Sequence, residues 1–125
     1  MRSFAWTTLL AGALTMISAT ALADMNPFGA MGLPLNKADY QEIAKAADPL
    51  LNDDSLPLGT KRDWANPKSG NQGTITLMDR LEKPYQGKNL PCRKLEYHVV
   101  TAQPGGPYNV VIDRCKAADG TWKIY

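Results

Sequence analysis

The segment LPCRKLEYHVVT (residues Leu90–Thr101), the connection AQPGGP (Ala102–Pro107) and the segment YNVVIDRCK (Tyr108–Lys116) decide the predicted fold. Both outer segments are rich in Val, Ile, Leu and Tyr, which favour β-strands. Proline and glycine fill the connection between them, which is typical of a turn. The stretch therefore predicts a β-hairpin.

One cysteine stands near the outer end of each strand of this hairpin, at Cys92 and Cys115. Opposed residues of an antiparallel pair have a constant index sum, so a pairing of the two cysteines fixes the whole register. At that register apolar residues also oppose each other, and a slip by one residue would break both patterns. The pairs are Leu95 with Ile112, Tyr97 with Val110 and Val99 with Tyr108. The hairpin thus predicts a disulfide, although a neighbouring offset stays open because Cα spacing limits which pairs can be bridged.

The first 23 residues have the three parts of a secretory signal peptide. Arg2 precedes an apolar centre, and Ala21 and Ala23 place small residues where a signal peptidase reads. We expect cleavage after Ala23, the alternative being an uncleaved membrane anchor. Residues 24–35 are expected to form a flexible leader. Export makes a structural disulfide the default reading of two cysteines.

Residues 36–125 are expected to form a single α+β domain. An N-terminal helix, capped by Asn36 and ended at Asp48 by Pro49, is predicted to pack on a small antiparallel meander of about four or five strands. Further strands are predicted at 62–65, 74–78 and 121–125, and a polar turn at 79–89. One disulfide completes the predicted architecture.

Composition and motifs exclude several function classes. The 125 residues carry 14 Lys and Arg against 12 Asp and Glu, and this net charge of +2 does not indicate a nucleic-acid partner. His98 is the one histidine, so with no C-x-x-C spacing it cannot complete a zinc site. We expect no cofactor, no metal and no catalytic residue, and therefore a protein that is not an enzyme.

A set of spaced residues resembles the C-terminal domain of bacterial 17 kDa surface antigen-like envelope proteins, over roughly residues 40–125. The resemblance rests on a Trp-x-Asn and Gly-Asn-x-Gly stretch before a strand, a Cys-Arg pair, a second cysteine and an Asp-Gly-Thr-Trp turn. The residues are Trp64, Asn66, Gly70, Asn71, Gly73, Cys92, Arg93, Cys115, Asp119, Gly120 and Trp122.

The resemblance implies an envelope component and carries over no catalytic residue. The chain has no lipid-attachment cysteine near the signal, and its Gly29–Gly32 segment is too short for a glycine-zipper hairpin. These departures favour the periplasm, with outer-membrane or surface association as the alternative. The matching Asn and Gly residues suit turns, so the motif is expected to be structural.

Two functional hypotheses follow for this chain. The first is a non-enzymatic exported envelope protein without a transmembrane segment after signal cleavage, which binds an envelope protein or a cell-wall component. The second is a secreted inhibitor of a hydrolase such as a lysozyme or a protease, with the loop 102–107 as the inserted element. The sequence indicates neither the partner nor the oligomeric state.

Overall fold

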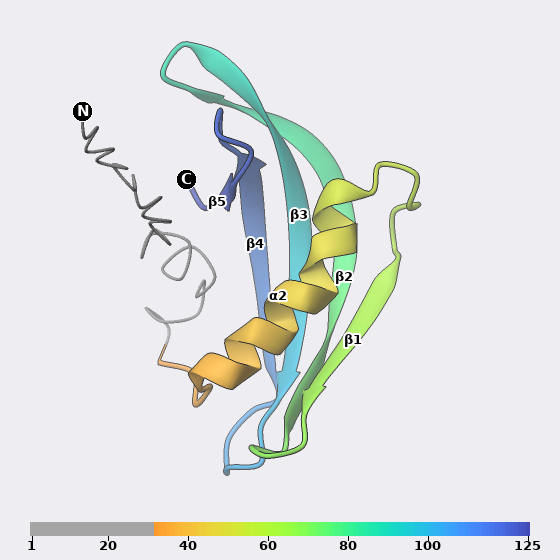
Figure 1. The fold of residues 1–125 in the computed structure, drawn as a ribbon, viewed down its shortest axis with the longest axis vertical. Helices are drawn as coiled ribbons and strands as arrows, with labels where there is room; N and C mark the ends of the chain where they lie inside the picture. The colour runs from red at the N-terminus through yellow and green to blue at the C-terminus, as the bar shows by residue number, and fades with distance from the viewer. Residues whose placement is uncertain (1–31) are drawn as a thin grey trace, which may run out of the picture.

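A computed structural model describes residues 32–125, so the expected signal peptide and most of the expected leader lie outside the described residues. Helix α2 (Lys37–Asn52) precedes one antiparallel sheet, whose strands follow the order β1-β2-β3-β4-β5. The helix lies across one face of this curled sheet (Figure 1). The α+β meander predicted from the sequence is confirmed in outline, with strands dominating. The strands are β1 (Lys61–Asn66), β2 (Asn71–Tyr85), β3 (Lys88–Val100), β4 (Tyr108–Lys116) and β5 (Trp122–Lys123).

Helix α2 begins at the predicted cap but runs further than predicted. The side chain of Asn36 and the side chain of Asp39 each accept a hydrogen bond from the other residue's backbone N–H, which forms a capping box. The helix continues through Pro49 to Asn52, so the predicted end at Asp48 is wrong. Proline removes one intrahelical bond, but the residues after it, Leu50 and Leu51, are buried in the core and keep this last turn in place.

The predicted register of the β3–β4 hairpin is confirmed. Cys92 lies opposite Cys115, and the two form the disulfide, with their Cα atoms 4.0 Å apart. The apolar pairs follow from the same alignment, as Leu95 with Ile112 and Tyr97 with Val110. The cysteines therefore join the ends of strands that the side-chain alternation already aligns.

The β2–β3 hairpin differs from the sequence prediction. The expected polar turn at 79–89 is wrong, because β2 continues to Tyr85 and β3 begins at Lys88. Only Gln86 and Gly87 form the connection, with φ of 50° and 76°, as a two-residue hairpin with a left-handed backbone requires. A bulge between Leu77 and Asp79 shifts the pairing within β2. Polar residues beyond the bulge pair as strand even though they lack the apolar alternation that marks one.

The core lies between α2 and the sheet face that we call the helix face. Leu33 and Leu35, in the last part of the expected leader, pack against this core. The opposite face, here called the open face, carries no helix among the described residues (Figure 1). Within residues 32–125 no helix is long and apolar enough to cross a membrane. The buried core residues are Ile43, Ala47, Leu50, Leu51, Trp64, Ile75, Leu77, Leu95, Tyr97, Val99 and Ile112.

Candidate functional site

Four of the motif residues lie at two places, one at each end of helix α2, namely Asn66, Asn71, Arg93 and Trp122. We call the first the N-terminal clamp and the second the C-terminal clamp. The N-terminal clamp consists of Asn36, Asp39, Asn66, Ser69 and Asn71. The C-terminal clamp consists of Asn52, Asp54, Arg93 and Trp122.

The centre of the N-terminal clamp is the carboxylate of Asp39, which is 0% exposed. Its Oδ1 accepts hydrogen bonds from Asn66 Nδ2 at 2.8 Å and from Ser69 Oγ at 2.6 Å. Its Oδ2 accepts from the backbone N–H of Asn36 and from Asn71 Nδ2, both at 2.8 Å. Four donors from the helix cap and the β1–β2 turn therefore surround one buried carboxylate, which can be buried only because it is bonded in this way.

Asn71 extends the N-terminal clamp to two more segments. Its Nδ2 also donates to the carbonyl of Pro34 at 3.2 Å, and its Oδ1 accepts from the backbone N–H of Ala102 at 3.0 Å. One side chain thus joins the segment before the helix, the start of β2 and the loop after β3. This use of both the amide and the carbonyl group explains an asparagine at this position.

The hydrogen bonds of the clamp also govern the titration of Asp39. Burial is the largest single influence and raises the pKa, because it disfavours the charged carboxylate. The donors from Ser69, Asn36, Asn71 and Asn66 together outweigh it, so the pKa lies below its ordinary value of 3.8. Asp39 is therefore held as a carboxylate, which removes it as a general acid at neutral pH.

The glycines of the motif allow close approach at two points of the β1–β2 hairpin. Gly70 has φ of +77°, and a Cβ there would lie 3.1 Å from the Cβ of Ala102. A Cβ on Gly73 would overlap the carbonyl oxygen of His98 and lie 2.6 Å from the indole Nε1 of Trp64. Trp64, paired with Gly73 across the strands, is buried over the space that the glycine leaves. The Trp and Gly of the motif thus form one packing unit.

The C-terminal clamp joins the end of α2 to the last two hairpins of the sheet. Trp122 Nε1 donates to Asn52 Oδ1 at 2.9 Å, and Arg93 Nη2 lies 2.8 Å from Asp54 Oδ1. The guanidinium of Arg93 also lies 5.5 Å from the centroid of the Trp122 ring, within the range of a cation–π contact. Arg93 and Trp122 therefore hold both the helix end and each other.

Three arginines form a row across the helix face, with Arg93 paired to Arg80 on β2 and to Arg114 on β4. Arg80 Nη2 donates to the carbonyl of Leu56 at 2.6 Å, and Arg114 Nη2 donates to the carbonyl of Trp122 at 2.9 Å. The row therefore fixes the loop after the helix and the final strand by bonds to backbone carbonyls. These bonds hold the loop and the strand in place.

Arg114 also lies beside the phenol of Tyr97 in the core. Burial raises the pKa of Tyr97, and the charge of Arg114 opposes this rise. Tyr97 is 0% exposed and is therefore held as a neutral phenol.

Asp119 and Gly120 form the turn before β5. The Oδ1 of Asp119 accepts from both the backbone N–H and the hydroxyl of Thr121, and these bonds lower the pKa of Asp119. Gly120 has φ of +87°, a conformation that favours glycine. The turn places Trp122 at the C-terminal clamp.

In the described part of the chain, no serine hydroxyl is bonded to the histidine ring. His98 Nδ1 lies 2.8 Å from Asn109 Oδ1 on the open face, and Ser69 Oγ is bonded to Asp39 instead of to a histidine. Between residues 32 and 125 no three His, Cys, Asp or Glu side chains lie close enough to hold a metal ion. The contacts of the two clamps fix the helix on the sheet.

The sequence does not single out Asp39 in the N-terminal clamp or Asp54 in the C-terminal clamp. The spacing Asn36-x-x-Asp39 is a capping-box signal, but nothing in the sequence indicates that Asp39 also binds a turn 30 residues away. The roles of Asn52 and Arg80 had no local signal at all.

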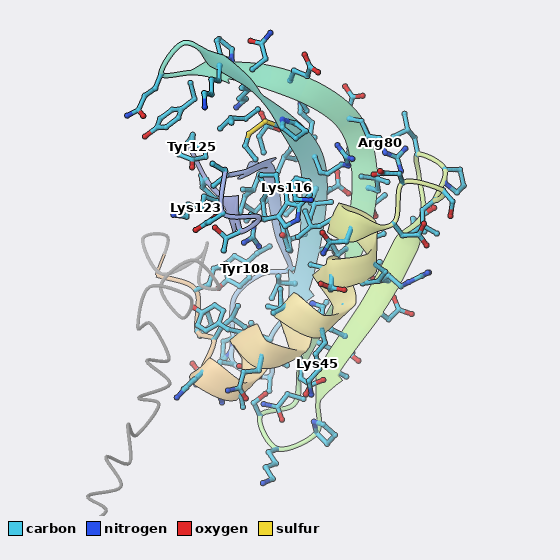
Figure 2. All side chains as sticks on the ribbon, turned by 45° about the horizontal axis from the view of Figure 1, so that its top comes forward. Lys45, Arg80, Tyr108, Lys116, Lys123 and Tyr125 are labelled. Carbon is cyan, nitrogen blue, oxygen red and sulfur yellow. A yellow bond between two sulfur atoms is a disulfide. The ribbon has the colours of Figure 1, made fainter. Side chains whose placement is uncertain are left out.

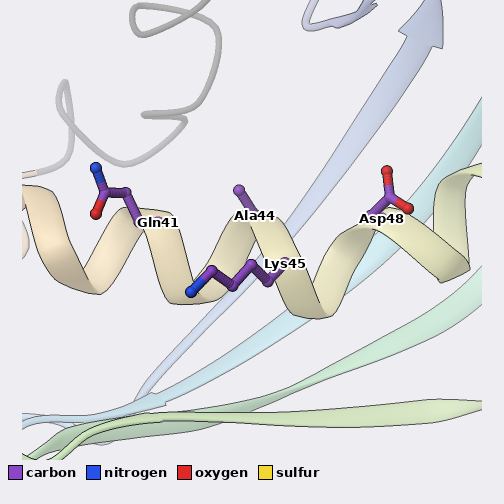
Figure 3. Close-up of a pocket in the computed structure, with 4 residues that line it drawn as sticks. All are labelled: Gln41, Ala44, Lys45 and Asp48. Carbon is purple, nitrogen blue, oxygen red and sulfur yellow. The ribbon is translucent and has the colours of Figure 1, made fainter.

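Surface depressions also lie outside the clamps among the described residues. One runs along the side of α2 that points away from the sheet, lined by Gln41, Ala44, Lys45 and Asp48 (Figure 3). A second lies over β1, β2 and β3 and is lined largely by open-face side chains. Its lining residues are Asp63, Trp64, Ala65, Gln72, Gly73, Thr74, His98 and Val100.

Comparison of the chain with known protein families, with characterised proteins and with solved structures found no match.

Proposed function

We propose that the chain is a non-enzymatic exported envelope protein that binds a protein or cell-wall component through the open face of its sheet. The observation that carries this proposal is that the motif side chains of both clamps bind within the molecule. The open face is a broad surface whose side chains do not hold the helix on the sheet. Export and location in the periplasm rest on the signal pattern, with which the Cys92–Cys115 disulfide is compatible.

The open face offers a mixed polar and apolar surface, as a partner-binding surface requires. A row of polar residues crosses it, in which Thr74 donates to Asp63 at 2.8 Å and His98 contacts Asn109 at 2.8 Å. These contacts hold the polar side chains in fixed positions, so little side-chain entropy would be lost on binding. Apolar side chains beside the row are exposed, namely Met78 (43%), Val100 (38%) and Val111 (55%).

Site-specific photo-crosslinking in the periplasm tests this surface. A photoreactive residue at Gln72, exposed on the open face, should give a reproducible cross-linked partner by mass spectrometry. The matched control is Gln41, which is also exposed but lies on the outer side of α2. No product at either site, or equal products at both, would contradict a binding surface on the sheet.

The second candidate function is inhibition of a hydrolase by the loop 102–107. The exposure and the anchoring of this loop favour inhibition. All six of its residues are exposed, and the loop is anchored at its start. Ala102 is bonded to Asn71, and Thr101 Oγ1 donates to the carbonyl of Gln103 at 3.1 Å. A loop held in this way loses little entropy on binding an active-site cleft.

Inhibition assays against lysozymes and bacterial proteases test the second candidate. The intact chain should inhibit, and replacement of residues 102–107 by a short turn should remove the inhibition. Absence of inhibition at high micromolar concentration would end this candidate without affecting the first.

A further inference from the structure

We propose that the outer edge of β4 pairs with the same edge of a second copy of this chain, so that two sheets join into one continuous antiparallel sheet. The edge concerned is the stretch Tyr108–Asp113. This proposal concerns self-association and does not depend on which partner the open face binds.

Strand β4 has only a short neighbour on its outer side. Within residues 32–125 the outer neighbour is β5, which pairs only with Cys115 and Lys116. Beyond Lys123 the chain leaves the edge, and the ring of Tyr125 lies 4.2 Å from the ring of Tyr85. Figure 2 shows Lys116 and Lys123 near one end of β4 and Tyr108 toward the other end. The backbone of Tyr108–Asp113 is therefore an edge without a described strand partner.

The register shows which backbone groups of this edge point outward. The short Cα separation of 4.0 Å between Cys92 and Cys115 marks a pair without mutual backbone hydrogen bonds. Alternation along the strand then directs the N–H and C=O groups of Asn109, Val111 and Asp113 away from β3. These are the groups that a further strand would bind.

A two-fold axis through Val111 matches these groups with themselves. Val111 then lies opposite Val111 of the second copy, and Asn109 lies opposite Asp113 in both directions. Every outward residue pairs with an outward residue, so the hydrogen bonds of the ladder can form without a register shift. The side chain of Val111, 55% exposed in the single chain, would then be covered by its symmetry mate.

Charge also favours a second copy at this edge over the other edge of the sheet. The stretch Tyr108–Asp113 carries one charged residue, Asp113, whose Oδ2 lies 2.8 Å from Lys83 Nζ. Two copies therefore meet without strong repulsion. By contrast β1 begins with Lys61, Arg62 and Asp63, the type of charged edge that prevents strand pairing.

Oligomeric state measured by light scattering and analytical ultracentrifugation tests the proposal on protein exported from the complete coding sequence. We expect a dimer that becomes a monomer when Val111→Lys places like charges opposite each other. The matched control is Ala65→Lys, which adds the same charge at an exposed position of the β1 edge. Thermal melts of both variants verify that each is folded.

A cysteine at the same position gives a second readout. Val111→Cys should form disulfide-linked dimers under mild oxidation, and Ala65→Cys should not, with peptide mapping used to verify that Cys92–Cys115 is intact. A monomeric wild-type protein at high concentration, or a dimer unchanged by Val111→Lys, overturns the proposal. Capture of another protein's strand by a monomeric chain would overturn it as well.

Discussion

Trp122 donates its indole N–H to the side-chain oxygen of Asn52 at 2.9 Å, across 70 positions of sequence. The bond joins the last strand to the last residue of the helix. Strands β1 to β4 lie between these two residues in the sequence, so the bond connects the two ends of the region that forms most of the sheet. Arg93 supports the same ring from the third strand at 5.5 Å.

A double-mutant cycle measures how much the bond between Trp122 and Asn52 contributes to the free energy of unfolding. We expect Trp122→Phe and Asn52→Ala each to destabilise the protein, and the double variant to lose less than the sum. The coupling should be about 0.5–1 kcal/mol, the size of a hydrogen bond that water can partly replace. The free energy of unfolding in urea is the measurement. Strict additivity would mean that the bond contributes nothing to folding.

Gly73→Ala tests the packing of Trp64 against the glycine of the motif. The added Cβ would overlap the His98 carbonyl and the Trp64 indole, so the strands must separate or the indole must move. We expect a loss of about 2 kcal/mol in unfolding free energy, as for overpacking of a filled core. Near-UV circular dichroism should report the displaced indole.

The control is Gly87→Ala in the β2–β3 turn, where no atom lies within 4 Å of the added Cβ. The positive φ of Gly87 makes its substitution cost about 1 kcal/mol, but by backbone strain alone. The near-UV spectrum of this variant should therefore be unchanged. Equal spectra for both variants would contradict the packing role of Gly73.

Loss of the disulfide should lower stability without unfolding the sheet. The Cys92→Ser, Cys115→Ser variant removes a bridge between residues 23 apart, and the loop-closure relation then gives about 3 kcal/mol. The remaining apolar pairs keep the β3–β4 register. Denaturation with and without reductant measures the loss. Reductant should destabilise the wild type by the same amount and leave the double variant unchanged.

The parts of the fold that could be predicted are those set by residues near one another in sequence. The register of β3 and β4 followed from Cys92, Cys115 and the apolar alternation between them. The β2–β3 hairpin was missed because residues 79–89 look polar and the Gln86-Gly87 turn is not a strong turn pair. Helix α2 passed Pro49 because tertiary burial of Leu50 and Leu51 outweighs a local penalty.

The sequence could identify several residues of the candidate site but not how they are arranged in space. Asn66, Asn71, Arg93 and Trp122 were singled out, and their structural role was expected. The common target of Asn66 and Asn71 could not be found, since these donors to Asp39 lie at a turn about 30 residues away and only the fold brings them together.

Asp39→Asn tests the N-terminal clamp directly. The substitution replaces one acceptor oxygen by an NH2 group that faces donors and removes the charge that the other donors stabilise. We expect a loss of about 2–3 kcal/mol in unfolding free energy, because several bonds to a buried charged group are weakened together. The control Asp48→Asn, on the exposed side of α2, should change stability by less than about 0.5 kcal/mol.

The lowered pKa of Asp39 predicts how the free energy of unfolding depends on pH. The pKa of Asp39 in the folded protein lies below the ordinary value of 3.8, so folding favours the ionised form. Its contribution is therefore fully present above the unfolded pKa and is lost as pH falls through the folded pKa. We expect the free energy of unfolding to be level above about pH 5 and to fall below it, less steeply in Asp39→Asn.

Among the described residues, two other carboxylates have lowered pKa values and must be separated from Asp39. Asp53 is bonded to Ser55 and Asp119 to Thr121, but both are exposed, so solvent screens their contributions. Asp53→Asn and Asp119→Asn should therefore retain most of the wild-type slope between pH 5 and pH 2, as urea denaturation at each pH can measure. A slope that is unchanged in Asp39→Asn but lost in either exposed variant would show that the acid sensitivity of the fold does not come from the buried clamp.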